Sequence, residues 1–144
     1  MDESEEPVQL AGSISGARPE VDLPLSMVII EDDEDFRFLM GRACERSERF
    51  SLVGQAADLP TAVELLTRHR PQVVVTDARL PATEDFAAVR MAREVCPDAT
   101  IVVLTGLSSD AHLALAHEAG AHHVVEKNAV VRVLVATIAD LLVV

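Results

Sequence analysis

Long apolar runs are absent from the 144-residue sequence, and its uninterrupted apolar stretches fall well short of the ~20 residues that span a bilayer. The N-terminus begins with acidic and polar residues, where a secretory leader would be basic and then apolar. We therefore expect a cytoplasmic protein with no membrane contact. The length fits a single compact domain with one core.

Cysteine and basic residues are both scarce. Cys44 and Cys96 lie far apart without C-x-x-C spacing, which argues against a disulfide framework or a thiolate metal site and favours two buried free thiols. The 12 basic residues face 24 acidic ones, so the formal charge of -12 would repel a phosphate backbone and excludes direct nucleic-acid binding. Lys127 is the only lysine, which suggests that its position matters.

The first 24 residues differ from the rest of the chain. They carry six acidic residues and one arginine, interleaved with Gly, Ser and Pro. We expect residues 1–24 to be an acidic, disordered tail without a function of its own, and residues 25–144 to form the domain.

The domain alternates short apolar runs with segments of helical period. Strands are expected over 27–30, 50–53, 72–76, 100–104 and 123–125, and helices over 35–46, 60–69, 85–95, 109–119 and 129–142. Strict alternation of this kind builds an α/β fold with a parallel sheet covered on both faces. Thr83 and either Ser108 or Ser109 are expected to cap helix N-termini, and Gly120 a helix C-terminus.

Reactive side chains follow four of the expected strands. Glu31, Asp32 and Asp33 follow the first, Asp77 the third, Thr105 the fourth and Lys127 the fifth. In a doubly wound sheet these strand ends meet at one edge, where ligands bind.

Clustered carboxylates repel one another unless a cation lies among them, and Mg²⁺ prefers oxygen ligands. Beside such an ion Asp77 could act as a nucleophile toward phosphorus, with a cation from Lys127 and a hydroxyl from Thr105. We expect the backbone N–H groups of Ala78 and Gly106 to complete a phosphoryl-binding cradle.

Four segments in order resemble the CheY-like receiver domains of bacterial response regulators. They are 28–33 with Arg37 following, 73–81, 101–106 and 120–127. The resemblance covers about residues 27–142 and implies a doubly wound, flavodoxin-like sheet of five parallel strands in the order 2-1-3-4-5 with five helices. Residues 52–54 with Asp58, and 127–129, look closest to receivers that precede LuxR-type helix-turn-helix effectors.

The resemblance also implies residue roles. Asp77 would be the phosphorylation site of a two-component system, in a reaction that depends on Mg²⁺. Glu31, Asp32, Asp77 and the backbone carbonyl of Arg79 would hold the ion, and Thr105 and Lys127 would sense the phosphoryl group. Such a protein accepts and loses a phosphoryl group without being a turnover enzyme.

Three departures from the family pattern affect signal output. Asp85 stands where the family usually has Gly, Asn128 replaces a frequent Pro, and the switch position is Val124 in place of Tyr or Phe. Without an aromatic switch, the loop of Thr105, Gly106 and Leu107 is the remaining candidate for the two-state element.

Two other features have several readings. His112, His117, His122 and His123 lack metal-ligand spacing and are interpreted as surface imidazoles. The last helix has a core stripe of Val131, Leu134, Val135, Ile138, Leu141 and Leu142, while extra apolar surface is expected at Val130, Val133, Val143 and Val144. That surface fits either a partner subunit or an effector domain continuing past Val144.

Two alternative functions remain open. Haloacid-dehalogenase-like phosphatases also use Asp, Thr or Ser, Lys and Mg²⁺, and residues 33–36 imitate their D-x-D opening, but their nucleophile lies on the first strand. A pseudo-receiver would keep the fold and signal without phosphate, as Asp85 and Val124 could suggest. The partners implied are a sensor histidine kinase, a second copy in a homodimer, and an effector domain or output protein. The face of helix four, strand five and helix five, with Leu115 and Val124, would receive them.

Overall fold

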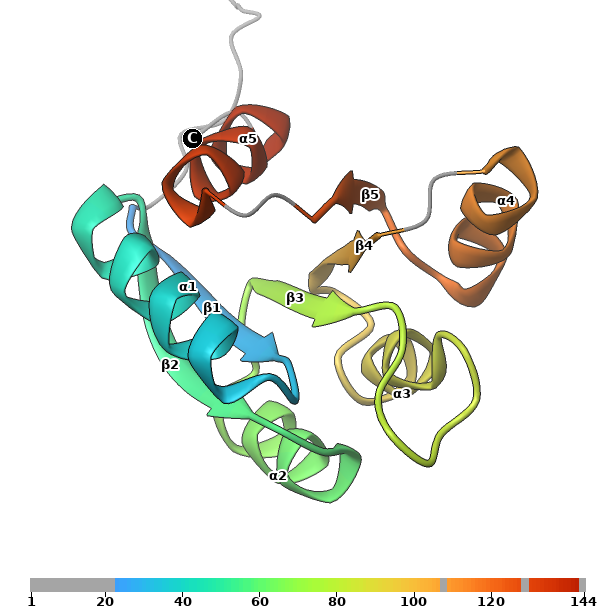
Figure 1. Cartoon of the computed structure of the whole chain (residues 1–144). Helices are drawn as coiled ribbons and strands as arrows, with labels where there is room; N and C mark the ends of the chain where they lie inside the picture. Colours follow the sequence, from blue (N-terminus) through green and yellow to red (C-terminus); the bar gives the residue numbers. More distant parts are fainter. Residues whose placement is uncertain (1–22, 107–108, 128–129, 143–144) are drawn as a thin grey trace, which may run out of the picture.

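The computed structural model of the chain describes residues 23–106, 109–127 and 130–142 (Figure 1). The expectations for the tail up to residue 22, Leu107, Ser108, Asn128, Val143 and Val144 lie outside these residues. Within the described ranges, none of the helices has the length and apolar character needed to cross a bilayer.

Strands and helices alternate along the whole domain, as the apolar pattern predicts. The strands are β1 (Leu25–Ile30), β2 (Phe50–Ala56), β3 (Val73–Asp77), β4 (Thr100–Thr105) and β5 (His123–Glu126). The helices are α1 (Glu34–Ser47), α2 (Leu59–His69), α3 (Ala87–Val95), α4 (Asp110–Ala119) and α5 (Val131–Leu142). Every expected element is present, and most bounds differ by one to three residues.

The five strands are parallel in the order β2-β1-β3-β4-β5, which confirms the predicted doubly wound sheet. Strand order reverses between β1 and β3, so the switch point of the sheet lies between these two strands. β1, β3 and β4 are almost wholly buried because helices cover both faces of the sheet (Figure 1).

Two apolar clusters fill the spaces on either side of the sheet. One includes Met27, Met40, Phe50 and Ile138, and so joins α1 and α5 to the sheet. The other packs α2, α3 and α4 against the opposite face. Cys44 and Cys96 are free and buried, as the sequence predicts.

Local side-chain chemistry fixes most helix ends. The carboxylates of Asp33 and Asp58 and the hydroxyl of Ser109 accept hydrogen bonds from backbone N–H groups at the starts of α1, α2 and α4. Gly120 ends α4 with φ 122°, as expected of a C-terminal cap.

The start of α3 differs from the sequence expectation. The helix begins at Ala87 instead of Asp85, because Phe86 takes a left-handed conformation with φ 63°. Thr83 does not cap it: the Thr83 hydroxyl donates to the carbonyl of Leu80. The prediction for Thr83 was wrong because the chain makes a turn before the helix begins.

α5 presents a narrower core stripe than predicted. Leu134, Val135 and Ile138 are buried, but Leu141 is 41% exposed and belongs to the surface. Val130 and Val133 are exposed, as expected.

Candidate functional site

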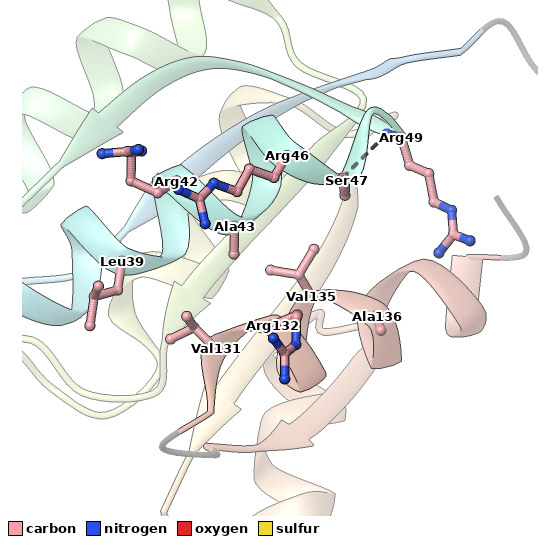
Figure 2. A pocket seen from close by; sticks show the side chains of 10 residues that line it. All are labelled: Leu39, Arg42, Ala43, Arg46, Ser47, Arg49, Val131, Arg132, Val135 and Ala136. Carbon is pink, nitrogen blue, oxygen red and sulfur yellow. Dashed lines mark hydrogen bonds between the residues drawn. The ribbon is translucent and has the colours of Figure 1, made fainter.

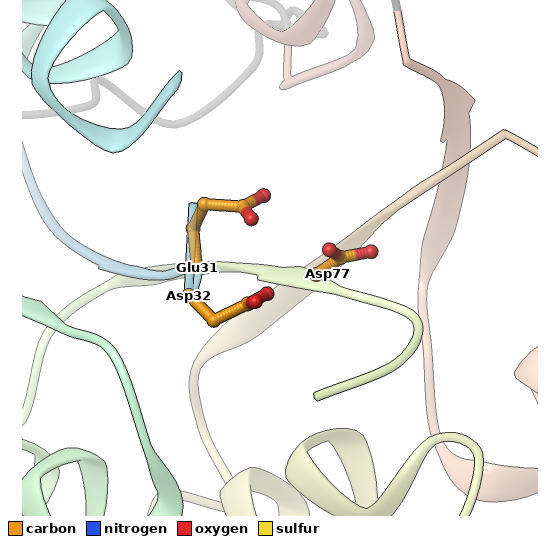
Figure 3. A group of neighbouring side chains, drawn as sticks. All are labelled: Glu31, Asp32 and Asp77. Atoms are coloured by element: carbon orange, nitrogen blue, oxygen red, sulfur yellow. The ribbon is translucent and has the colours of Figure 1, made fainter. Parts of the chain in front are cut away.

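The carboxylates of Glu31, Asp32 and Asp77 meet at the switch point (Figure 3). Glu31 directly follows β1, and Asp77 is the last residue of β3, the neighbouring parallel strand. One oxygen from each of the three side chains lies within 4.8 Å of the others. The two strand ends therefore bring Glu31 and Asp32 close to Asp77, which lies 46 positions after Glu31 in the sequence.

Glu31 is held firmly in the loop after β1. Its N–H donates to the carbonyl of Ala56 at 2.9 Å, and its carbonyl accepts from Arg37 Nη1 at 2.8 Å. Glu31 Oε2 accepts a hydrogen bond from the Asp33 N–H at 3.0 Å. These bonds fix a carboxylate that is only 2% exposed, while Asp32 beside it is exposed.

Lys127 reaches into the carboxylate cluster from the end of β5. Its Nζ lies 2.9 Å from Glu31 Oε1 and donates to Asp77 Oδ2 at 3.2 Å. The Lys127 N–H donates to the carbonyl of Thr105 at 2.8 Å, which ties the residue to the end of β4. The Phe36 ring contacts the ammonium, with 4.6 Å between Nζ and the ring centroid.

The charges of the cluster shift the pKa values of two of its members. Burial raises the pKa of Glu31, and the negative charge of Asp77 raises it further, although the Asp33 N–H and Lys127 oppose the shift. Burial works against the charge of Lys127, but its contacts with Glu31 and Asp77 outweigh that effect and raise its pKa. The ammonium is therefore a strongly held cation.

The residues fit a hard divalent cation. Glu31 Oε1 is buried and lies 2.9 Å from the Lys127 ammonium. Clustered carboxylates repel one another, and a single ammonium faces three of them here, so the cluster can accommodate a further cation. Together with oxygens of Asp32 and Asp77, the Glu31 carboxylate offers an all-oxygen donor set suited to Mg²⁺.

Thr105 is contacted by a residue that the sequence reasoning placed elsewhere. His112 Nε2 lies 3.0 Å from Thr105 Oγ1, and the His112 ring packs on Phe86 with 5.0 Å between ring centroids. The interpretation of His112 as a surface imidazole was therefore wrong. The signal available in the sequence was its place on the first turn of the helix after β4, which points its side chain back toward the strand end.

The loop after β3 corrects one further expectation. The Ala78 N–H donates to the carbonyl of Leu104 at 2.9 Å, so it serves sheet pairing and not a phosphoryl cradle. Arg79 comes next in the chain, and its side chain pairs with Asp85 at 3.0 Å. In the described ranges, the Arg79 N–H donates no hydrogen bond, which leaves it as a donor near Asp77.

Val124 lies in the middle of β5, partly buried against the α2–α3–α4 side of the core. It offers no aromatic ring that could change position. Leu115 on α4 is 54% exposed. The structure thus places an apolar side chain on the surface of α4 and a small, packed one at the position expected to switch.

The chain belongs to the response regulator receiver domain family, whose model matches residues 27–139. This agrees with the strand order and with the acidic cluster at the switch point. It is a different family from the haloacid-dehalogenase-like phosphatases considered from the sequence.

Named relatives support the assignment. The transcriptional regulatory protein PdtaR of Mycobacterium tuberculosis is 33% identical over 101 residues, covering 69% of this chain and 47% of that protein. A protein-glutamate methylesterase/protein-glutamine glutaminase of Shewanella is 28% identical over 91 residues, covering 62% of this chain and 26% of that protein. The chain therefore spans less than half the length of these two curated relatives.

Solved structures give the same fold. A two-component response regulator of the LuxR family from Aurantimonas is 29% identical with a TM-score of 0.73, covering 83% of this chain and 85% of that one. A response regulator from Burkholderia pseudomallei is 27% identical with a TM-score of 0.68, covering 78% of this chain and 65% of that one. That structure contains a phosphorylated aspartic acid, a calcium ion and citrate.

Proposed function

We propose that this chain is a phosphoacceptor, and that Asp77 receives the phosphoryl group in a Mg²⁺-dependent reaction. The observation that carries the proposal is the cluster of Glu31, Asp32 and Asp77 at the switch point, with the Lys127 ammonium 2.9 Å from Glu31 and 3.2 Å from Asp77. Glu31, Asp32, Asp77 and the carbonyl of Arg79 would hold the ion. The phosphorylated aspartic acid and calcium ion in the Burkholderia relative support this assignment.

The Asp77 carboxylate acts as the nucleophile. One of its oxygens forms a bond to phosphorus as the bond from phosphorus to the donor breaks, and the electron pair of that bond leaves with the donor group. The donor is a phosphohistidine of a sensor histidine kinase or a small acyl phosphate. The product is an aspartyl phosphate, which water hydrolyses back to the carboxylate.

The surrounding residues stabilise charge on the transferring group. Lys127 exchanges its contact with Asp77 for one with a phosphoryl oxygen, and the Thr105 hydroxyl donates to another. The N–H groups of Arg79 and Gly106 complete the cradle, with Arg79 in the place first expected for Ala78. A Mg²⁺ ion held by these residues would neutralise negative charge on the carboxylates and the phosphoryl group.

The proposed output runs from Thr105 and Val124 to the face formed by α4, β5 and α5. The phosphoryl group draws Thr105 and the loop after β4 toward Asp77, which changes the surface around Leu115. A second copy, an effector domain or an output protein reads this change. We also propose that the chain is cytoplasmic and has no turnover activity of its own.

The test uses the full chain with Mg²⁺ and either acetyl phosphate or phosphoramidate, followed by intact-mass measurement. We expect one phosphoryl adduct that disappears on addition of EDTA and in Asp77→Asn. Asp98→Asn, which removes an exposed carboxylate from the α3–β4 loop, is the matched control and should keep the adduct. An adduct of undiminished yield in Asp77→Asn would overturn the assignment of Asp77.

A pseudo-receiver is the second candidate, favoured by Val124 at the switch position and by the exposed Asp85–Arg79 pair at the loop after β3. It would bind its partner without phosphate. No adduct with either donor, together with amide spectra that fluoroberyllate leaves unchanged, would support this second function.

A further inference from the structure

Four arginines line a single groove between α1 and α5 (Figure 2), on the face of the sheet opposite to α4 (Figure 1). Arg42 and Arg46 come from α1, Arg49 from the turn that follows it, and Arg132 from α5. The groove measures about 440 Å³, and the described residues that line it include no carboxylate. A protein of net charge -12 thus concentrates four of its 12 basic side chains at one place.

None of the four guanidinium groups forms an ion pair with a residue of the described ranges. Arg42 rests on the Phe38 ring, 5.8 Å from its centroid, which still leaves its charge available. By contrast, Arg68, Arg79 and Arg90 each have a carboxylate partner. Between the arginines the floor is apolar, formed by Leu39, Ala43, Val131, Val135 and Ala136. Such a groove suits a segment that carries both acidic and apolar side chains.

The chain itself carries such a segment. Residues 2–6 include four carboxylates, and Val8 and Leu10 follow within four positions. Glu20 and Asp22 add two more negative charges ahead of β1, against a single Arg18.

The start of β1 lies at one end of the groove. The Leu25 N–H donates to the carbonyl of Arg49 at 2.9 Å, so residues 1–22 join the domain beside a residue that lines the groove. A tether of about 15 residues can reach tens of ångströms and keeps its end at an effective concentration on the order of millimolar.

We propose that the acidic N-terminal segment, residues 2–10, binds in the α1–α5 arginine groove of its own chain. The carboxylates of residues 2–6 pair with Arg42, Arg46 and Arg132, and Val8 with Leu10 covers the apolar floor around Val131. The proposal does not depend on phosphorylation of Asp77, which lies at a different edge of the molecule.

Paramagnetic broadening in the full-length protein tests the contact. A nitroxide is attached to the thiol introduced by Ser4→Cys, and ¹⁵N amide signals are recorded at low ionic strength. Burial of Cys44 and Cys96 directs the label to the new thiol, and burial also raises the pKa of Cys44 to about 12. We expect broadening at residues 39–49 and 131–136 and not on α2 or α3.

Charge variants show whether the arginines cause the broadening. Arg42→Gln/Arg46→Gln should reduce it severalfold, as should raising the ionic strength to about 0.5 M, where the Debye length is only a few ångströms. The matched control is Arg68→Gln/Arg90→Gln, which removes the same charge from α2 and α3 and should leave the broadening unchanged. Neutralising Asp2, Glu3, Glu5 and Glu6 to their amides should abolish it.

Three results would overturn the proposal. One is broadening spread evenly over the surface. Another is broadening of equal size in Arg42→Gln/Arg46→Gln and in the control variant Arg68→Gln/Arg90→Gln. The third comes from a mixture of two chains, one ¹⁵N-labelled without the nitroxide and one carrying the nitroxide without ¹⁵N. Broadening of the ¹⁵N-labelled chain in this mixture would show that the segment of a second copy binds in the groove.

Discussion

Lys127 balances two carboxylates that would otherwise face each other across the switch point. Glu31 is 2% exposed and Asp77 16% exposed, so water relieves little of their repulsion. The contact with Phe36 adds a further attraction for the ammonium. The sole lysine is thus a structural cation in the metal-free protein as well as a candidate for phosphoryl binding.

Replacing Lys127 tests that structural part. We expect Lys127→Met to lower the free energy of unfolding by about 1 to 3 kcal/mol in EDTA, because it leaves a buried negative charge uncompensated. Lys127→Met/Asp77→Asn should recover part of the loss. Urea denaturation measures both, and Arg68→Met, at an exposed ion pair, should change stability by less than about 0.5 kcal/mol. Equal losses in the single and double variants would contradict the explanation.

His112 holds the Thr105 hydroxyl from the side of α4, and we expect this contact to oppose movement of Thr105 toward Asp77. His112→Phe keeps a ring against Phe86 but removes the hydrogen bond. If Thr105 moves on activation, fluoroberyllate should bind about 2- to 10-fold more tightly to this variant, since a net hydrogen bond is worth about 1 kcal/mol. Titration followed by amide spectra measures the affinity, with His117→Phe as control. Weaker binding would contradict this role.

At the scale of elements, the C-terminal end of α4 depends on the absence of a side chain at Gly120. Its φ of 122° favours glycine, and a Cβ there would lie 2.2 Å from Arg93 Cγ. We expect Gly120→Ala to lower the free energy of unfolding by about 1 to 3 kcal/mol. Adding Arg93→Ala should restore the steric part of the loss and leave the backbone part.

Thermal and urea unfolding measure the effect of the Gly120 substitution. Gly106→Ala is the control, because Gly106 has no positive φ and no atom within 4 Å of an added Cβ. A loss at Gly106 as large as that at Gly120 would show that close packing at α4 is not the cause.

The central strands can be predicted well from the sequence because both of their faces are buried, which leaves a continuous apolar run. β1, β3 and β4 each carry three or more consecutive apolar residues, as expected of strands covered on both faces. The start of α3 could not be predicted in the same way. The positive φ of Phe86 is imposed by tertiary contacts, including the hydrogen bond from its N–H to the carbonyl of Ala78, and Phe has no local preference for it.

In the candidate site, too, some contacts could be predicted from the sequence and others could not. Strand-end positions brought Glu31, Asp77 and Lys127 together as expected, because parallel strands end at one edge. The contacts of Thr105 with His112, and of Lys127 with Phe36, were missed. Both depend on how helices α4 and α1 lie over the edge, which periodicity alone does not fix.

At the scale of the whole molecule, stability should depend on pH through His122. Its Nδ1 accepts a hydrogen bond from the Ile101 N–H at 3.0 Å, which requires the ring nitrogen to be unprotonated. Partial burial lowers the pKa of His122 below its usual 6.5, and the charge of Arg93 lowers it further. The folded protein therefore binds fewer protons here than the unfolded chain does.

The sign of the pH effect follows from that difference. The stabilisation is fully present above the unfolded pKa of about 6.5 and is lost as pH falls through the lower folded value. His122→Asn keeps a hydrogen-bond acceptor but cannot titrate, so its free energy of unfolding should fall less between about pH 7 and pH 5. Urea denaturation across this range measures the slopes. A steeper slope in His122→Asn than in the wild type, or a change equal to that of His69→Gln, would contradict the assignment.

The backbone hydrogen bond from the Lys127 N–H to the carbonyl of Thr105 couples the ends of β4 and β5. Because this hydrogen bond joins the ends of β4 and β5, we expect a shift of the Thr105 backbone to be transmitted to the backbone of Lys127. Movement of Thr105 would then also change the position of the ammonium that contacts Glu31 and Asp77. We therefore expect Thr105 and Lys127, which are 22 positions apart in the chain, to respond together to a phosphoryl group.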